Sequence, residues 1–129
     1  MGRKLTSYNG LDDIYTPKDM AKSIVEYINP TGIVLEPCRG DGSFTSIFDE
    51  KNIPYEWCEI KDGVDFFDMK YSNANWLITN PPFSKITKFI QKTIELQIPN
   101  IALLVTINTI WMNGKLNILK SNGYQLKEI

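Results

Sequence analysis

The tetrapeptide Asn80-Pro81-Pro82-Phe83 carries the most specific chemistry that the sequence offers. Two consecutive prolines restrict the backbone angles and remove two amide donors, so we expect the Pro81 carbonyl to face outward. The side-chain carbonyl of Asn80 stands beside it, and two rigid acceptors suit an exocyclic NH₂ group. Phe83 is placed to stack on the ring that bears this group. The alternative is a turn that ends a strand and buries Phe83 in the core.

A second segment, Glu36-Pro37-Cys38-Arg39-Gly40-Asp41-Gly42, combines an acid with two glycines. Glycines spaced by one residue let the backbone turn tightly and approach a ligand. A dinucleotide-binding loop needs a third glycine where Thr45 stands, and Glu36 would repel a pyrophosphate. The segment therefore favours a cationic ligand, such as an amino acid joined to a sulfonium. An ordinary glycine turn is the alternative.

Two further positions have residue types typical of nucleoside binding. Glu59 lies nineteen residues after Gly40, where a carboxylate can accept both hydroxyls of a ribose. Asp65 can accept from an adenine amino group, and Phe66 can cover the ring. A solvated loop acid and a core phenylalanine are the simpler interpretations of these positions. The aspartates here do not have the spacing of a calcium loop, so we predict no metal site.

The elements that must position these residues alternate between strand and helix patterns. Thr16-Pro17 predicts a helix start with Thr16 as N-cap, and Asn29-Pro30 predicts its end. Strands are predicted at 33–35, 55–60 and 75–79, a short element at 64–67, a central parallel strand at 101–105 and a terminal strand at 124–126. Helices are predicted from Ser43, at 84–96 and near 116–119. The helix at 84–96 is expected to direct Ile86, Phe89, Ile90 and Ile94 inward and Lys85, Lys88 and Lys92 outward.

This alternation predicts an α/β fold with a mainly parallel sheet flanked by helices. Ligands bind such sheets beyond the carboxyl ends of the strands. The four chemistry-bearing segments lie at or near the ends of predicted strands or short elements, so we expect them to meet at one edge of the sheet.

The composition narrows the classes of function. The chain has 129 residues, which fits a single domain spanning 1–129, and its net charge of −1 excludes a uniformly basic surface for nucleic acid. It has no histidine, which excludes histidine-based triads and histidine-ligated zinc. The two cysteines lack a CxxC spacing and are expected to be reduced thiols. No apolar run is long enough for a membrane span, and a cytoplasmic location is expected.

Taken together and in this order, the segments resemble the amino-methylating DNA methyltransferases that use S-adenosylmethionine, especially the N6-adenine enzymes. The resemblance runs from about Tyr15 to Asn108. It assigns cofactor contacts to Tyr15, Thr16, Pro17, Glu36, Pro37, Cys38, Gly40, Gly42, Glu59, Asp65, Phe66 and Asn80. It assigns catalysis to Asn80, Pro81, Pro82 and Phe83.

The resemblance implies a Rossmann-like methyltransferase fold that lacks the last strands. It implies methyl transfer from S-adenosylmethionine to adenine N6, most simply in DNA, leaving S-adenosylhomocysteine. The chain after 105 is short for a target-recognition region, so a homodimer or a partner subunit would supply recognition. Three alternatives stay open: a non-catalytic S-adenosylmethionine-binding module, methylation of adenine in RNA, and methylation of protein glutamine.

Overall fold

A four-stranded parallel sheet organises the molecule. The computed structural model describes residues 16–105 and 114–127. The strands are β1 (Val34–Glu36), β2 (Tyr55–Trp57), β3 (Trp76–Thr79) and β4 (Asn100–Leu103), in the spatial order β2-β1-β3-β4. Every pairing between them is parallel. The predicted α/β architecture with a parallel sheet is therefore confirmed for this part of the chain.

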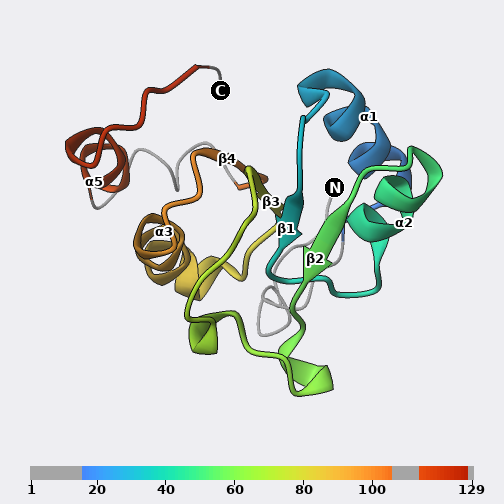
Figure 1. Ribbon diagram of the computed structural model, residues 1–129, viewed down its shortest axis with the longest axis horizontal. Coiled ribbons are helices and arrows are strands. Elements are labelled where there is room, and N and C mark those ends of the chain that lie inside the picture. Colours follow the sequence, from blue (N-terminus) through green and yellow to red (C-terminus); the bar gives the residue numbers. More distant parts are fainter. Residues whose placement is uncertain (1–15, 106–113, 128–129) are drawn as a thin grey trace, which may run out of the picture.

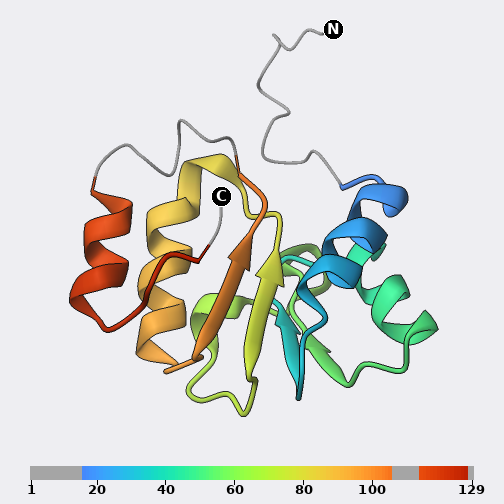
Figure 2. The same ribbon diagram turned by 90° about the horizontal axis from the view of Figure 1, so that it is seen from above.

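Helices cover both faces of the sheet. α1 (Lys18–Ile28) and α2 (Ser43–Glu50) lie on one side, and α3 (Ile86–Glu95) and α5 (Lys115–Ser121) lie on the other (Figures 1 and 2). Three short 3₁₀ helices complete the described elements: η2 (Ile60–Asp62), η3 (Phe66–Asp68) and η4 (Phe83–Lys85).

Alternation along the strands builds two separate cores. Successive strand residues point to opposite faces of a sheet. Accordingly Leu35 and Leu77 pack with the α3 side, whereas Val34 and Ile78 pack with the α1 and α2 side. All four residues are at most 1% exposed. With apolar side chains on both faces, β1 and β3 are the buried centre of the sheet, which is where a parallel sheet needs continuous apolar runs.

Two predictions about side-chain direction are wrong. Thr16 does not cap α1: the N-cap is Pro17, and the helix has no side-chain capping hydrogen bond there. The Thr16 hydroxyl instead accepts a hydrogen bond from Asn80, a partner 64 residues away that local sequence cannot reveal. Lys92 does not point outward, because its side chain is 10% exposed and its Nζ donates to the Met69 carbonyl at 2.6 Å. A long aliphatic stem lets lysine lie along an apolar surface while its amine finds a partner.

Three of the predicted strands also differ from the observed structure. The apolar segment at 101–105 contributes β4, which lies at the edge of the described sheet rather than at its centre. The segment at 55–60 is a strand only as far as Trp57, and the short element at 64–67 is no strand but overlaps η3 at its end. The segment at 124–126 is irregular; Tyr124 donates from its hydroxyl to the Ile98 carbonyl at 2.5 Å, which ties it to the turn before β4. Among the described residues no strand follows β4.

Candidate functional site

The strand order reverses between β1 and β3, and the candidate site lies there. The chain leaves β1 for β2 on one side and returns to β3 on the other. In open α/β sheets ligands bind at such a switch point, beyond the carboxyl ends of the strands. A cleft at this position has about 240 Å³ of empty space, counting the part that is open to solvent. It is lined by Thr16, Glu36, Cys38, Arg39, Gly40, Asp41, Ser43, Phe44 and Asn80.

A larger, more open depression of about 760 Å³ lies elsewhere, among Val25, Glu26, Asn29, Pro30, Glu50, Lys51, Asn52 and Ile53. These residues lie at the C-terminal ends of α1 and α2, before β1 and β2, so the depression lies toward the amino ends of the strands. It contains an exposed Lys51–Glu26 ion pair at 3.0 Å and none of the predicted site residues. The smaller cleft is therefore the candidate site.

Glu36 ends β1 as a buried carboxyl group at the floor of the cleft. It is 1% exposed, and its Oε1 accepts hydrogen bonds from the Cys38 amide at 2.7 Å and from the Thr79 hydroxyl. Burial raises the pKa of Glu36 to about 8, although these two hydrogen bonds act to lower it. Both bonds fall on the same oxygen, so Oε2 is the atom left for a ligand. The charge of that ligand would therefore decide whether Glu36 is protonated or ionised.

The two glycines shape the loop above Glu36. Gly40 and Gly42 both have positive φ, +60° and +89°, a region that L side chains rarely adopt. Gly42 is the N-cap of α2, and a Cβ there would lie 3.3 Å from the Thr45 hydroxyl oxygen. The loop geometry thus requires glycine at these positions and brings backbone to the rim of the cleft, as the spacing predicted.

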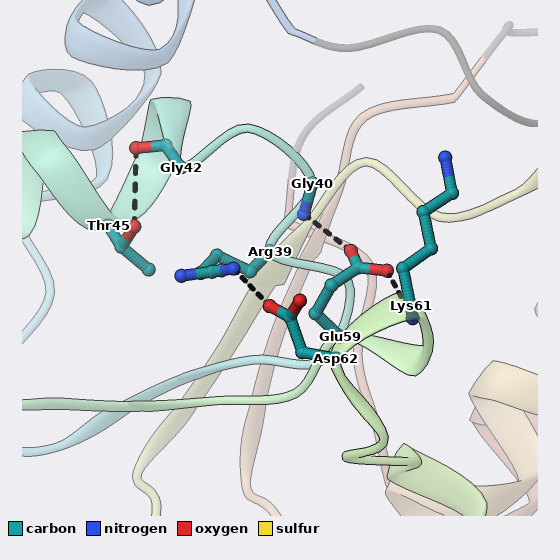
Figure 3. A network of polar contacts seen from close by, with 7 residues as sticks. All are labelled: Arg39, Gly40, Gly42, Thr45, Glu59, Lys61 and Asp62. Carbon is teal, nitrogen blue, oxygen red and sulfur yellow. Dashed lines mark hydrogen bonds and ion pairs between the residues drawn. The ribbon is translucent and has the colours of Figure 1, made fainter.

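Glu59 holds this loop in place. Its Oε1 accepts from the Gly40 amide at 2.8 Å, and its Oε2 accepts from the Lys61 amide at 3.0 Å, where Glu59 caps η2 (Figure 3). A carboxylate has about four acceptor positions, so two remain after these bonds. Glu59 is therefore both a support for the glycine loop and a group able to accept from hydroxyls of a ligand above it.

Arg39 has a role that the sequence did not reveal. Its guanidinium stacks 4.2 Å from the centre of the Trp57 ring. It also pairs with Asp62, as Figure 3 shows. Its Nε is buried and has no hydrogen-bond partner among the described residues. Arg39 thus links the glycine loop to the end of β2. A basic residue inside an otherwise acidic loop was the available signal, but the register that brings Trp57 beside it comes from the fold.

The tetrapeptide follows β3 directly, and its first residue faces the cleft. Asn80 is half-buried and donates from Nδ2 to the Thr16 hydroxyl oxygen at 3.1 Å. Pro81 is buried, and the Pro82 carbonyl accepts from the Lys85 amide at 3.0 Å as η4 begins. Phe83 opens η4 and is half-buried. The Pro82 carbonyl is thus used by the turn, which leaves Pro81 as the proline whose carbonyl could serve a ligand.

The structure does not bring Asp65 and Phe66 into the cleft. Asp65 caps η3, accepting from the Phe67 amide at 2.9 Å. Phe66 is 2% exposed, and its ring centre lies 5.6 Å from that of Phe67 and 5.2 Å from that of Phe89. Phe66 is thus a core residue on the α3 side of the sheet.

The other predicted site residues divide as follows. Those that line the cleft are Thr16, Glu36, Cys38, Gly40 and Asn80. Pro37 is buried, Pro17 is exposed, and Tyr15 lies outside the described residues. Cys38 and Cys58 are both free cysteines. Burial raises the pKa of the Cys38 thiol far above its ordinary value. In the described part of the chain, no group of three or more acidic or cysteine side chains could hold a metal ion.

The fold and the site together define an open, parallel α/β protein with a glycine-containing loop and a buried acid at its switch point. No family model, no curated protein and no solved structure matches this chain. Within residues 16–105 and 114–127, no helix has the length and apolar character needed to cross a bilayer.

Proposed function

We propose that the protein transfers a methyl group from S-adenosylmethionine to the exocyclic N6 amine of adenine in DNA. The observation that carries the proposal is the convergence of Glu36, Gly40 and Asn80 on one cleft at the switch point. Glu36 and Gly40 come from the segment that the sequence resemblance links to cofactor binding, and Asn80 comes from the tetrapeptide that it links to catalysis. The proposed fold is correspondingly a Rossmann-like methyltransferase fold.

The donor set of the cleft fits the amino-acid end of the cofactor. Glu36 presents a buried oxygen to a cationic ammonium group, and an ion pair of this kind favours its ionised form. The cleft is small and partly open to solvent, so it would hold only part of the molecule. Glu59, outside the lining of the cleft, would accept from the ribose hydroxyls.

Asn80 would orient the target amine. The cofactor supplies, when bound, an electrophilic methyl group on its sulfonium. Asn80 Oδ1 and the Pro81 carbonyl would accept hydrogen bonds from N6, directing its lone pair toward that methyl group. Phe83 would stack on the adenine, which must leave the duplex to reach it. Positioning of this kind can supply several kcal/mol, about 7–11 at its upper range. The chain has no histidine, and the proton of the methylated amine would leave to solvent.

Exposed lysines near the tetrapeptide would meet the nucleic-acid backbone. Lys85 and Lys88 are exposed on η4 and α3, just after Phe83. With a net charge of −1, the remaining affinity for DNA would come from a second copy or a partner subunit.

The test measures transfer of labelled methyl groups to unmethylated DNA, to an RNA transcript and to protein, with mass spectrometry of the products. We expect N6-methyldeoxyadenosine. Asn80→Ala should lower the rate at least about 100-fold, as loss of a transition-state hydrogen bond does. Its affinity for S-adenosylmethionine, measured by calorimetry, should change less than threefold. Asn73→Ala, exposed and outside the cleft, is the matched control.

Each other result has a definite meaning. Methylated RNA or methylglutamine alone would move the activity to the corresponding alternative. Cofactor binding without transfer to any of the three would identify a binding module. No binding at millimolar cofactor, or full activity of Asn80→Ala, would overturn the proposal.

A further inference from the structure

Thr16 lies between the two halves of the candidate site. It is 7% exposed and lies two residues before Lys18, the first residue of α1. Its hydroxyl oxygen accepts from Asn80 Nδ2 at 3.1 Å, and its carbonyl accepts from the Ser43 hydroxyl at 2.5 Å. Ser43 is the first residue of α2, directly after the glycine loop. Thr16 therefore joins the loop and the tetrapeptide through two different atoms.

The backbone at Asn80 is already held by other contacts. β3 pairs with β1 and β4 on its two sides, and the Thr79 hydroxyl donates to the buried Glu36. The freedom that remains at Asn80 is rotation of its side chain. The bond to Thr16 restricts this rotation, because it holds the amide nitrogen at a fixed, partly buried point.

The orientation of this amide decides what it can do. A side-chain amide has a donor end and an acceptor end, and only the acceptor can receive a hydrogen bond from an amine of the substrate. With Nδ2 bonded to Thr16, Oδ1 is the free end of the side chain. Without that bond the amide could rotate and present NH₂ groups to the incoming amine, which would repel rather than orient it.

We propose that Thr16 is a positioning residue, whose hydroxyl holds the Asn80 amide so that Oδ1 faces the amine to be methylated. This inference rests on the proposed function and deepens it. The sequence resemblance assigned Thr16 to the cofactor, whereas the structure directs its side chain to the tetrapeptide.

Two variants separate the hydroxyl from the rest of the side chain. Thr16→Val keeps the branched shape and the backbone carbonyl but loses the acceptor, and Thr16→Ser keeps the acceptor. We expect Thr16→Val to lower kcat about tenfold, with the KM for S-adenosylmethionine changed less than threefold. Thr16→Ser should stay within about threefold of the wild type. In an Asn80→Ala background, Thr16→Val should have no further effect on kcat, because coupled residues do not contribute additively.

A second readout needs no activity. In a ¹⁵N-labelled protein, the side-chain amide signals of Asn80 are identified by their loss in Asn80→Asp. We expect Thr16→Val to shift these signals and speed their exchange with water, and Thr16→Ser to preserve them. Unchanged amide signals in Thr16→Val would overturn the inference. Equal losses of kcat in both variants, or an undiminished effect in the Asn80→Ala background, would also overturn it.

Failure of the proposed function would be distinguishable from failure of this inference. A wild-type protein that transfers no methyl group refutes the proposed function and, with it, the catalytic part of the role of Thr16. The amide signals then still decide whether Thr16 holds Asn80. If the wild type is active but Thr16→Val retains full kcat, only the inference fails.

Discussion

Replacing Glu36 with glutamine should remove a large pH dependence from the stability of the protein. Glu36 is 1% exposed, and its Oε1 accepts from Thr79 and from the Cys38 amide. Glutamine has nearly the same shape and keeps a carbonyl oxygen for both donors. It cannot ionise, however, so the substitution isolates the free energy of placing a charge at this buried position.

The size and sign of the effect follow from the pKa of Glu36. Burial raises this pKa from 4.5 to about 8. Between these values the unfolded chain is ionised at Glu36 and the folded chain holds the proton. The stabilisation associated with the neutral form is complete below pH 4.5 and is lost as the pH rises toward 8. The linkage is about 1.4 kcal/mol per pH unit, or roughly 4 kcal/mol between about pH 5 and pH 8.

The assay is urea unfolding followed by tryptophan fluorescence at half-unit steps from pH 5 to pH 8.5. The free energy of unfolding of Glu36→Gln minus that of the wild type should increase by roughly 4 kcal/mol from pH 5 to pH 8. Taking the difference cancels other titrating groups that lie far from residue 36. Glu56→Gln, exposed on β2, is the matched control. A difference that stays constant within about 1 kcal/mol across this range would refute the reasoning.

Three further predictions concern the same elements. Because a bound cation favours the ionised form of Glu36, the affinity for S-adenosylmethionine should rise by up to about tenfold per pH unit between pH 6 and 8. Calorimetry should find this increase in the wild type and not in Glu36→Gln. Gly32→Ala should cost about 3 kcal/mol in urea unfolding, because φ is +81° and a Cβ would lie 2.1 Å from Asn75 Oδ1. Gly63→Ala, with positive φ but open space, should cost about 1 kcal/mol; equal costs would contradict the clash. Burial raises the pKa of Cys58 to about 11. Iodoacetamide at pH 8 should therefore label Cys58 about 100-fold more slowly in the folded protein than in guanidinium, as measured by mass spectrometry. Equal labelling rates would contradict this prediction.

Much of the fold was predictable because its signals are local. Buried strands read as apolar runs, and the α3 stripe of Ile86, Phe89 and Ile90 is buried as its helical spacing predicts. The glycine loop was predictable too, since the positive φ of Gly40 and Gly42 is a property of the backbone at those residues.

The errors arose where distant partners decide the outcome. Thr16 has a residue type and position typical of an N-cap, but Asn80, directly after β3, donates to its hydroxyl oxygen. Lys92 is on a face that would be solvated in an isolated helix, and the loop at Met69 covers it. The run at 101–105 is as apolar as a central strand. In the described sheet, however, it contributes the edge strand β4, and its residues are half-buried.

By itself the sequence determined which residues could do chemistry and that strands and helices alternate to carry them. Residue type, glycine spacing and apolar periodicity act over a few positions, so they can be read along the chain. Only the tertiary structure decided that Phe66 is core, that Arg39 stacks on Trp57, and that Thr16 binds Asn80. These contacts join residues that strand order and helix packing bring together, and hydrogen bonds and burial depend on distances in space.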